Sequence, residues 1–186
     1  MISPRAKIEC AKLFPQCLGE SLRSEAHPIW RTQPVDGKEI DAKRFIMLTL
    51  SSYDFRMLVV LHFSADTAAL NYAADSLKIA SGELSLPQFH DYLSEVGNLL
   101  CGSIKRHLKS SYPNLGISTP NQLGSESIKY VEICAIDHAI HSMATAEDGT
   151  IFYGSLYMSS VGDFDIDPNA ISTGEEIVEM GALELF

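Results

Sequence analysis

Residues 91–109 read DYLSEVGNLLCGSIKRHLK, a stretch with the spacing of an amphipathic helix. At about 100° per residue, apolar side chains from this stretch and the residues just before it fall within a sector of about 80°. They are Phe89, Leu93, Val96, Leu100 and Ile104. This apolar stripe predicts the face that the helix buries against a core.

The side of the helix opposite the stripe carries a line of residues that packing does not require. Asp91, Glu95, Asn98 and Gly102 fall within a sector of about 60°, so their side chains can act together. We call these four residues the polar line. Asn is a poor interior helix residue, and an interior glycine costs about 0.5–1 kcal/mol relative to alanine.

A solvated surface is the plain alternative for the polar line, but Lys, Glu or Ala would form such a surface at lower cost. The composition therefore favours a helix that is inserted into another protein. In this interpretation Gly102 leaves space for the backbone of the partner.

Turn and capping signals place three helices along the chain. Ser85-Leu86-Pro87-Gln88 is a capping box, with Pro in the first turn, that opens the helix of the polar line, and this helix should end near Ser110. Ser64 is predicted to cap a shorter helix over 65–77. A first helix should run from Ser3-Pro4 to about Arg23, with Pro15 kinking or dividing it.

Segments rich in β-forming residues predict a sheet around these helices. Residues 44–52 and 56–64 flank Tyr53-Asp54-Phe55 and should form an antiparallel hairpin. Shorter or weaker strands are expected at 29–35 and 116–123, and longer ones at 128–136 and 150–160. The order of elements predicts an α+β domain: a mixed, largely antiparallel sheet with two long helices and one shorter helix.

Size and charge narrow the class of protein. The chain has 186 residues, which fits one domain with a genuine core, and its formal net charge is -10. This balance argues against binding to nucleic-acid backbones or to anionic membranes. The N-terminus has no apolar run typical of a signal peptide, and the most apolar stretch, MLVVLHF, is far shorter than a membrane span. The 4 cysteines are scattered, so we expect reduced thiols and a cytoplasmic location.

The acidic charge is concentrated at the C-terminus. From Gly162 onward the chain contains no Lys or Arg. The acidic residues there are Asp163, Asp165, Asp167, Glu175, Glu176, Glu179 and Glu184. We therefore expect a domain over 1–161 and an exposed acidic extension over 162–186.

Other candidate reactive groups do not form a recognisable site. His138 and His141 lack an evident third metal ligand, and His90 points about 100° away from Asp91 on the helix. Cys101 lies off the polar line and is interpreted as a buried structural thiol. No metal site and no cofactor of its own are predicted.

The polar line and Pro120 together match a known pattern. Asp91, Glu95 four residues later, Asn98 three further, and Pro120 after 21 intervening residues resemble the signature of the CheC/CheX/FliY phosphatases of bacterial chemotaxis. The resemblance extends through the order of elements from about residue 4 to 161.

The number of signature sites indicates the subgroup. Only one Glu-x-x-Asn occurs in this chain, and CheX-like members carry one such site where CheC-like members carry two. The chain is therefore identified as CheX-like. It departs from the glycine-rich hairpin turn of CheX, because Tyr53-Asp54-Phe55 stands there.

The resemblance implies a phosphatase that acts on the aspartyl phosphate of a CheY-like receiver domain in two-component signalling. The receiver would supply Mg²⁺ and a Lys beside the phosphoryl group. Asn98 would orient the attacking water, and Glu95 would pair with the receiver's Lys. Asp91 would support Glu95 or orient the site, while Pro120 would shape the strand beside the helix.

Two further expectations come with the resemblance. CheX-like proteins are homodimers, and apolar strand edges such as 56–63 would be compatible with pairing between subunits. The alternative function is a non-catalytic module that uses the same helix to dock a receiver domain or a component of the flagellar switch.

Overall fold

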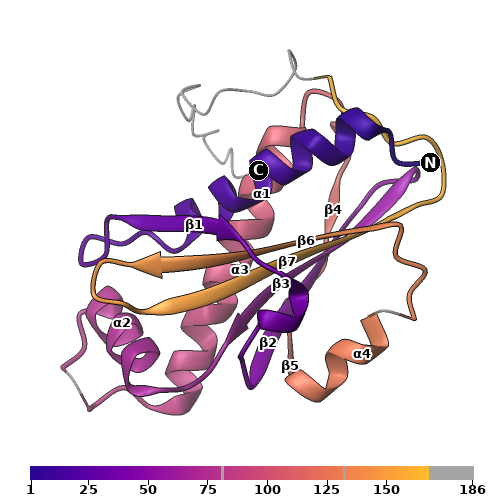
Figure 1. The fold of residues 1–186 in the computed structure, drawn as a ribbon. Coiled ribbons are helices and arrows are strands. Elements are labelled where there is room, and N and C mark those ends of the chain that lie inside the picture. Colours follow the sequence, from indigo (N-terminus) through magenta and orange to yellow (C-terminus); the bar gives the residue numbers. More distant parts are fainter. Residues whose placement is uncertain (81, 132, 168–186) are drawn as a thin grey trace, which may run out of the picture.

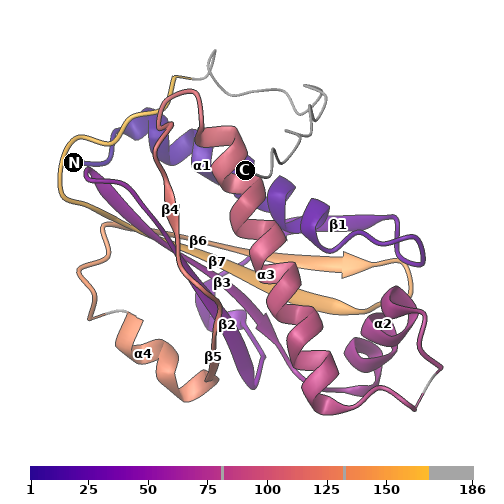
Figure 2. The same ribbon diagram turned by 180° about the vertical axis from the view of Figure 1, so that it is seen from behind.

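The chain forms one antiparallel sheet with helices on both faces (Figures 1 and 2). The computed structural model describes residues 1–80, 82–131 and 133–167. The helices are α1 (Pro4–Ser21), α2 (Thr67–Leu77), α3 (Leu86–Leu108) and α4 (Ile128–Val131), with 3₁₀ turns η1 (Gly37–Glu39) and η2 (Ser125–Ser127). The strands are β1 (Trp30–Pro34), β2 (Arg44–Ser51), β3 (Phe55–Phe63), β4 (Gly116–Ile117), β5 (Asn121–Gly124), β6 (His138–Ala146) and β7 (Ile151–Ser160).

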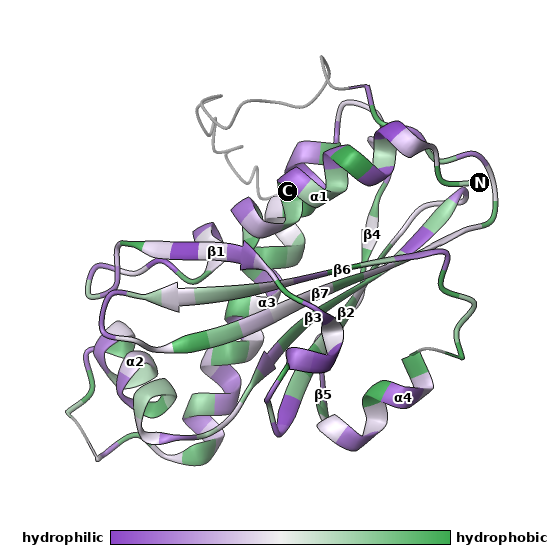
Figure 3. Cartoon of the chain, viewed as in Figure 1, coloured by the Kyte–Doolittle hydropathy of each residue, from purple (hydrophilic) through white to green (hydrophobic). Residues whose placement is uncertain are grey.

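The seven strands follow the order β1-β6-β7-β3-β2-β4, and β5 also pairs with β2. All pairs of named strands are antiparallel. The two long helices, α1 and α3, pack on one face, where they form the main core with the sheet. Figure 3 shows apolar and polar residues alternating along both helices, as expected for helices with one buried side. The expected α+β fold is confirmed.

The predicted hairpin is present, and its second strand lies in the middle of the sheet. β2 and β3 pair from Arg44↔Phe63 to Ser51↔Arg56, and β3 also pairs with β7 along nearly its whole length. The apolar run of β3 is explained by burial on both faces. The expectation that this run forms a free edge was therefore wrong.

Helix α1 is not divided at Pro15, and the cap of α2 differs from the prediction. α1 runs through Pro15 without a break, held by the buried side chains of Phe14 and Leu18 on either side. α2 is capped by Asp66, whose Oδ1 accepts from the backbone N–H of Ala69 at 2.9 Å. Ser64 instead accepts from the backbone N–H of Lys43 at 3.2 Å.

The strand predicted over 128–136 was wrong. This segment contains the short helix α4, and the next strand, β6, begins at His138. Ile128, Val131 and Ile136 pack against the outer face of the sheet, over Phe45, Leu58, Val60 and Tyr157. A single helical turn buries Ile128 and Val131 as well as a strand would, so their spacing did not distinguish the two.

The start of the predicted acidic extension is packed onto the domain. Phe164 and Ile166 are each 1% exposed, and Phe164 forms a parallel bridge with Ile2. Asp165 is bound by the side chains of Ser3 and Arg5. Residues 163–166 therefore belong to the domain. The rest of the expected extension, from 168 to 186, lies outside the described residues.

Candidate functional site

Helix α3 forms as its sequence predicts. The Ser85 side chain accepts from the backbone of Gln88, and the Gln88 side chain accepts from the backbone of Ser85, so both halves of the capping box are present. Every residue of the apolar stripe is at most 2% exposed. The opposite side of α3 therefore faces away from the core.

The polar line lies on this outward side. Asp91 and Glu95 are exposed, while Asn98 and Gly102 are half-buried. In the part of the chain that the structure describes, neither the Glu95 carboxylate nor the Asn98 carboxamide forms a hydrogen bond or an ion pair. Two strongly polar side chains one turn apart are thus available to a second molecule.

The two interior glycines of α3 serve different purposes. A Cβ on Gly97 would lie 3.0 Å from Leu48 Cδ1 and 3.2 Å from Ile46 Cγ2, so this glycine lets α3 approach β2 closely. A Cβ on Gly102 would meet no atom closer than Arg106 Nη1, at 3.9 Å. Contacts among the described residues therefore do not explain Gly102.

Pro120 lies in the segment that joins β4 to β5, and Figure 2 shows this segment running alongside α3. Gln122 Nε2 ties it to the helix by donating to the His90 carbonyl at 3.2 Å and to Ser94 Oγ at 3.0 Å. The expected strand over 116–123 is thus two short strands, and Pro120, which has no N–H to donate, stands just before the second. The structure thus brings the β4–β5 segment, in which Pro120 lies, beside α3.

An exposed apolar residue next to the polar line was missed by sequence reasoning. Leu99 is 56% exposed, one residue after Asn98. Its position outside the apolar stripe was the available signal. A single exposed apolar side chain is common on protein surfaces, so Leu99 alone does not define an interface.

The structure places His90, for which no dyad with Asp91 was predicted, among aromatic rings. The His90 ring packs against Phe63 and Phe89. Burial and then the charge of Arg44 lower the pKa of His90, and the opposing effect of Asp91 is smaller. Cys101 is fully buried, as predicted, and burial raises the pKa of its thiol to about 12, which disfavours the reactive thiolate.

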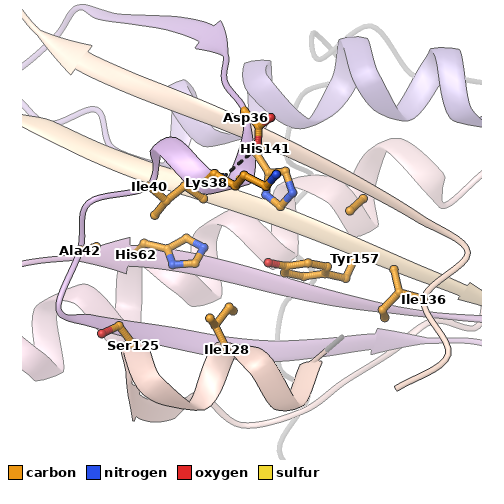
Figure 4. A pocket seen from close by; sticks show the side chains of 12 residues that line it. Asp36, Lys38, Ile40, Ala42, His62, Ser125, Ile128, Ile136, His141 and Tyr157 are labelled. Atoms are coloured by element: carbon orange, nitrogen blue, oxygen red, sulfur yellow. Dashed lines mark hydrogen bonds between the residues drawn. The ribbon is translucent and has the colours of Figure 1, made fainter. Parts of the chain in front are cut away.

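A second polar cluster lies on the opposite face of the sheet, in a cavity of about 610 Å³ (Figure 4). His62 and His141 line the cavity, and the buried Ser155 Oγ lies 2.8 Å from both His62 Nε2 and His141 Nδ1. Burial lowers the pKa of His62 to about 4, so this ring is neutral at pH 7. Sequence reasoning missed the cluster because three different strands contribute to it.

His138 and His141 do not form a pair. Both lie in β6, three residues apart, so their side chains point to opposite faces of the sheet. His141 lines the cavity with η1, whereas His138 faces the side of α1 and its pKa is lowered by burial and then by the charge of Lys7. The rejection of a two-histidine metal site is explained by this alternation.

Comparison with known proteins identifies the fold. The sequence matches no protein-family model and no curated protein. Its structure is similar to CheX from Vibrio vulnificus, with TM-score 0.61 and 16% identity over 81% of this chain and 99% of that one. It is also similar to a CheC-like protein from Shewanella oneidensis, with TM-score 0.59 and 14% identity over 82% of this chain and 99% of that one.

A third similar structure is the CheX–CheY–BeF₃–Mg²⁺ complex of Borrelia burgdorferi, with TM-score 0.56 and 14% identity over 82% of this chain and 97% of that one. The chain thus belongs to the class of α+β domains with two long helices on one face of an antiparallel sheet. More narrowly, it has the CheC/CheX-like fold. Among the described residues, no helix has the length and apolar content needed to cross a bilayer.

Proposed function

We propose that this chain is a phosphatase that removes the phosphoryl group from an aspartate of a CheY-like receiver domain. The observation that carries the proposal is the pair Glu95 and Asn98, which project from the outward side of α3 without a partner among the described residues. The fold of CheX, one example of which was solved in complex with CheY, supports the choice of partner.

The proposed role of Asn98 is to orient the attacking water. The carboxamide oxygen accepts one hydrogen of the water, whose oxygen then attacks phosphorus in line with the bond to the aspartyl oxygen. That P–O bond breaks, releasing inorganic phosphate and the receiver's carboxylate. Phosphoryl transfer depends mostly on positioning and charge stabilisation, so an amide that fixes the water is sufficient and no strong base is required.

Glu95 is proposed to fix the register of the inserted helix. Its carboxylate, one turn before Asn98, would form a charge-assisted pair with a receiver Lys. Asp91, one turn earlier, would support this pair, and Gly102 would leave clearance for the receiver backbone. Pro120 would shape the segment between β4 and β5 beside the helix. Mg²⁺ would come from the receiver.

The test is phosphate release from a panel of the host's receiver domains, phosphorylated with acetyl phosphate. Asn98→Ala should lower the rate about 100-fold while the complex still forms, because only the positioned water is lost. Asn114→Ala is the matched control, since Asn114 is an exposed loop residue outside α3. Full activity of Asn98→Ala on an accelerated receiver would refute the mechanism.

Glu95→Gln should weaken both binding and turnover, because it removes the charge that pairs with the receiver. Glu147→Gln, in the exposed turn between β6 and β7, removes the same charge elsewhere and should change neither. Binding of a receiver by the wild type without any acceleration would instead establish the alternative, a docking module.

We also propose a homodimer. β3 lies inside the sheet, so any pairing between subunits would have to use another surface. Light scattering coupled to size-exclusion chromatography should give twice the chain mass of 20.4 kDa, and a monomer at all concentrations would refute the proposal.

A further inference from the structure

We propose that Cys17, Glu20 and His107 bind a divalent transition-metal ion of the zinc class where α1 packs against α3. One ligand atom from each residue lies within 4.8 Å of the others. Cys17 and Glu20 are three residues apart on α1, which puts them on one side of that helix, and His107 lies in the last turn of α3. This inference is independent of the proposed phosphatase function.

The hydrogen bonds around the cluster leave it incompletely satisfied. Gln16 Nε2 donates to Glu20 Oε1 at 2.9 Å, which fixes the carboxylate. Ser103 Oγ lies 3.3 Å from Glu20 Oε2 and 3.4 Å from Cys17 Sγ. A hydroxyl has a single hydrogen, so Ser103 can donate to only one of these two acceptors at a time.

The imidazole of His107 provides the second indication. Its Nδ1 is buried and has no hydrogen-bond partner among the described residues. A buried nitrogen without a partner bears its full desolvation cost, and a metal ion beside Cys17 and Glu20 would remove that cost by accepting its lone pair. We therefore assign Nδ1 as the ligating atom of His107.

The donor set identifies the class of ion. One sulfur, one imidazole nitrogen and one carboxylate oxygen match Zn²⁺, whereas Mg²⁺ and Ca²⁺ prefer oxygen ligands. The Cys17 thiolate and the Glu20 carboxylate together balance the two positive charges, so the occupied site is neutral. Such neutrality suits a site in which Cys17 is fully buried and the other two ligands are half-buried.

Metal binding has a proton balance that can be measured. A cysteine binds a metal ion as the thiolate, so the Cys17 thiol must lose its proton when the ion binds. Binding replaces that proton by the Cys17 Sγ–metal bond and releases one H⁺ to solvent. Affinity should therefore increase with pH.

The ion would connect α1 and α3, two helices that are far apart in the sequence. α1 is the first element of the chain, and α3 carries the polar line as well as His107. Because an ion that binds only the folded state stabilises it by mass action, Zn²⁺ should raise the melting temperature of the wild type.

The experiment is a titration of the metal-free protein with Co²⁺, followed by competition with Zn²⁺. Wild type should bind one Co²⁺ per chain with a thiolate-to-cobalt charge-transfer band, which Zn²⁺ removes. Cys17→Ser should lose the band, and Glu20→Gln and His107→Gln should each bind at least about tenfold more weakly. Cys10→Ser and Cys134→Ser are matched controls, one buried on the same helix and one exposed, and should keep the band.

The melting temperature gives a readout that separates loss of metal from loss of fold. Zn²⁺ should raise it in the wild type and in both controls, and raise it less in His107→Gln at the same Zn²⁺ concentration. Absence of a thiolate band in the wild type, or an unchanged band in Cys17→Ser, would overturn the proposal. Should Cys17→Ser fail to fold, an unchanged Co²⁺ affinity of His107→Gln would overturn it equally.

Discussion

At the scale of single residues, α3 contains two glycines that its helical conformation does not require. Gly97 is required by its tight approach to Leu48 and Ile46 of β2. Gly102 has open space around it and lies on the polar line. Glycine is thus needed for close packing at position 97 and, under the proposed function, for contact with a partner at position 102.

Substituting each glycine by alanine separates these roles. Gly97→Ala should destabilise the fold by about 1–3 kcal/mol, because the added methyl group overpacks the contact with β2. Gly102→Ala should stabilise it by about 0.5–1 kcal/mol through helix propensity and yet reduce receiver dephosphorylation. Urea unfolding and phosphate release measure the two effects, and a Gly102→Ala variant with undiminished activity would argue against the clearance role.

His62 predicts a dependence of stability on pH. Its pKa is lowered from 6.5 to about 4, chiefly by burial, so below pH 6.5 the unfolded chain binds a proton that the folded chain does not. The contribution of His62 to stability is complete above pH 6.5 and is lost as the pH falls toward 4.

Between pH 7.5 and 5, wild type should therefore lose about 2 kcal/mol more unfolding free energy than His62→Gln. Urea unfolding at both pH values measures the difference. Comparing the changes within each protein removes any direct effect of the substitution on stability. The pKa of His141 is also lowered mainly by burial, and its effect on the unfolding free energy is present in both proteins. Equal losses would contradict the lowered pKa of His62.

At the scale of elements, α3 is a helix whose start is fixed by its own side chains. The reciprocal bonds of Ser85 and Gln88 satisfy backbone groups that have no partner within the helix. The buried stripe then orients the helix, and this orientation turns the polar line outward. The cap fixes the start of the helix and the buried stripe fixes its orientation. The cap can therefore be weakened without changing the orientation of the polar line.

Ser85→Ala should lower the unfolding free energy by about 1 kcal/mol, because the cap is lost. The rate of receiver dephosphorylation should be unchanged at temperatures where the variant is folded, since residues 91–102 keep their orientation on the sheet. Thermal unfolding and phosphate release test the two parts. Loss of activity in a variant that is still folded would show that the first turn of α3 contacts the partner.

At the scale of the whole molecule, the two ends of the described chain hold each other in place. Ile2 pairs with Phe164, and the Tyr112 hydroxyl donates to the Asp165 carbonyl at 3.0 Å. The Phe164 ring also packs on Phe55, at a centroid distance of 4.3 Å. The last described residues therefore cover the part of the core that lies beside β3 and the N-terminus.

Phe164→Ala should destabilise the domain by about 3–5 kcal/mol, the usual range for removing a buried aromatic ring. Val161→Ala is the control, because Val161 is 87% exposed and should change stability little. Midpoints of urea unfolding measure both. A small effect of Phe164→Ala would show that residues 163–166 are dispensable and would support a domain that ends near 161.

The sequence by itself determined the features that depend on local periodicity. The stripe and the polar line of α3 follow from 3.6 residues per turn, and the capping box and the hairpin follow from residues close together in the chain. For the same reason Asp91, Glu95, Asn98 and Gly102 could be placed on one outward side before the structure was known.

Only the tertiary structure decided the features that depend on distant contacts. Residues 128–131 fold as a helical turn that packs over Phe45 and Val60, and the sequence of the turn does not encode this contact. Likewise, His62 meets Ser155, and Cys17 meets His107, because packing brings separate strands and helices together. Burial by distant segments, not local spacing, gives these side chains their neighbours and their chemistry.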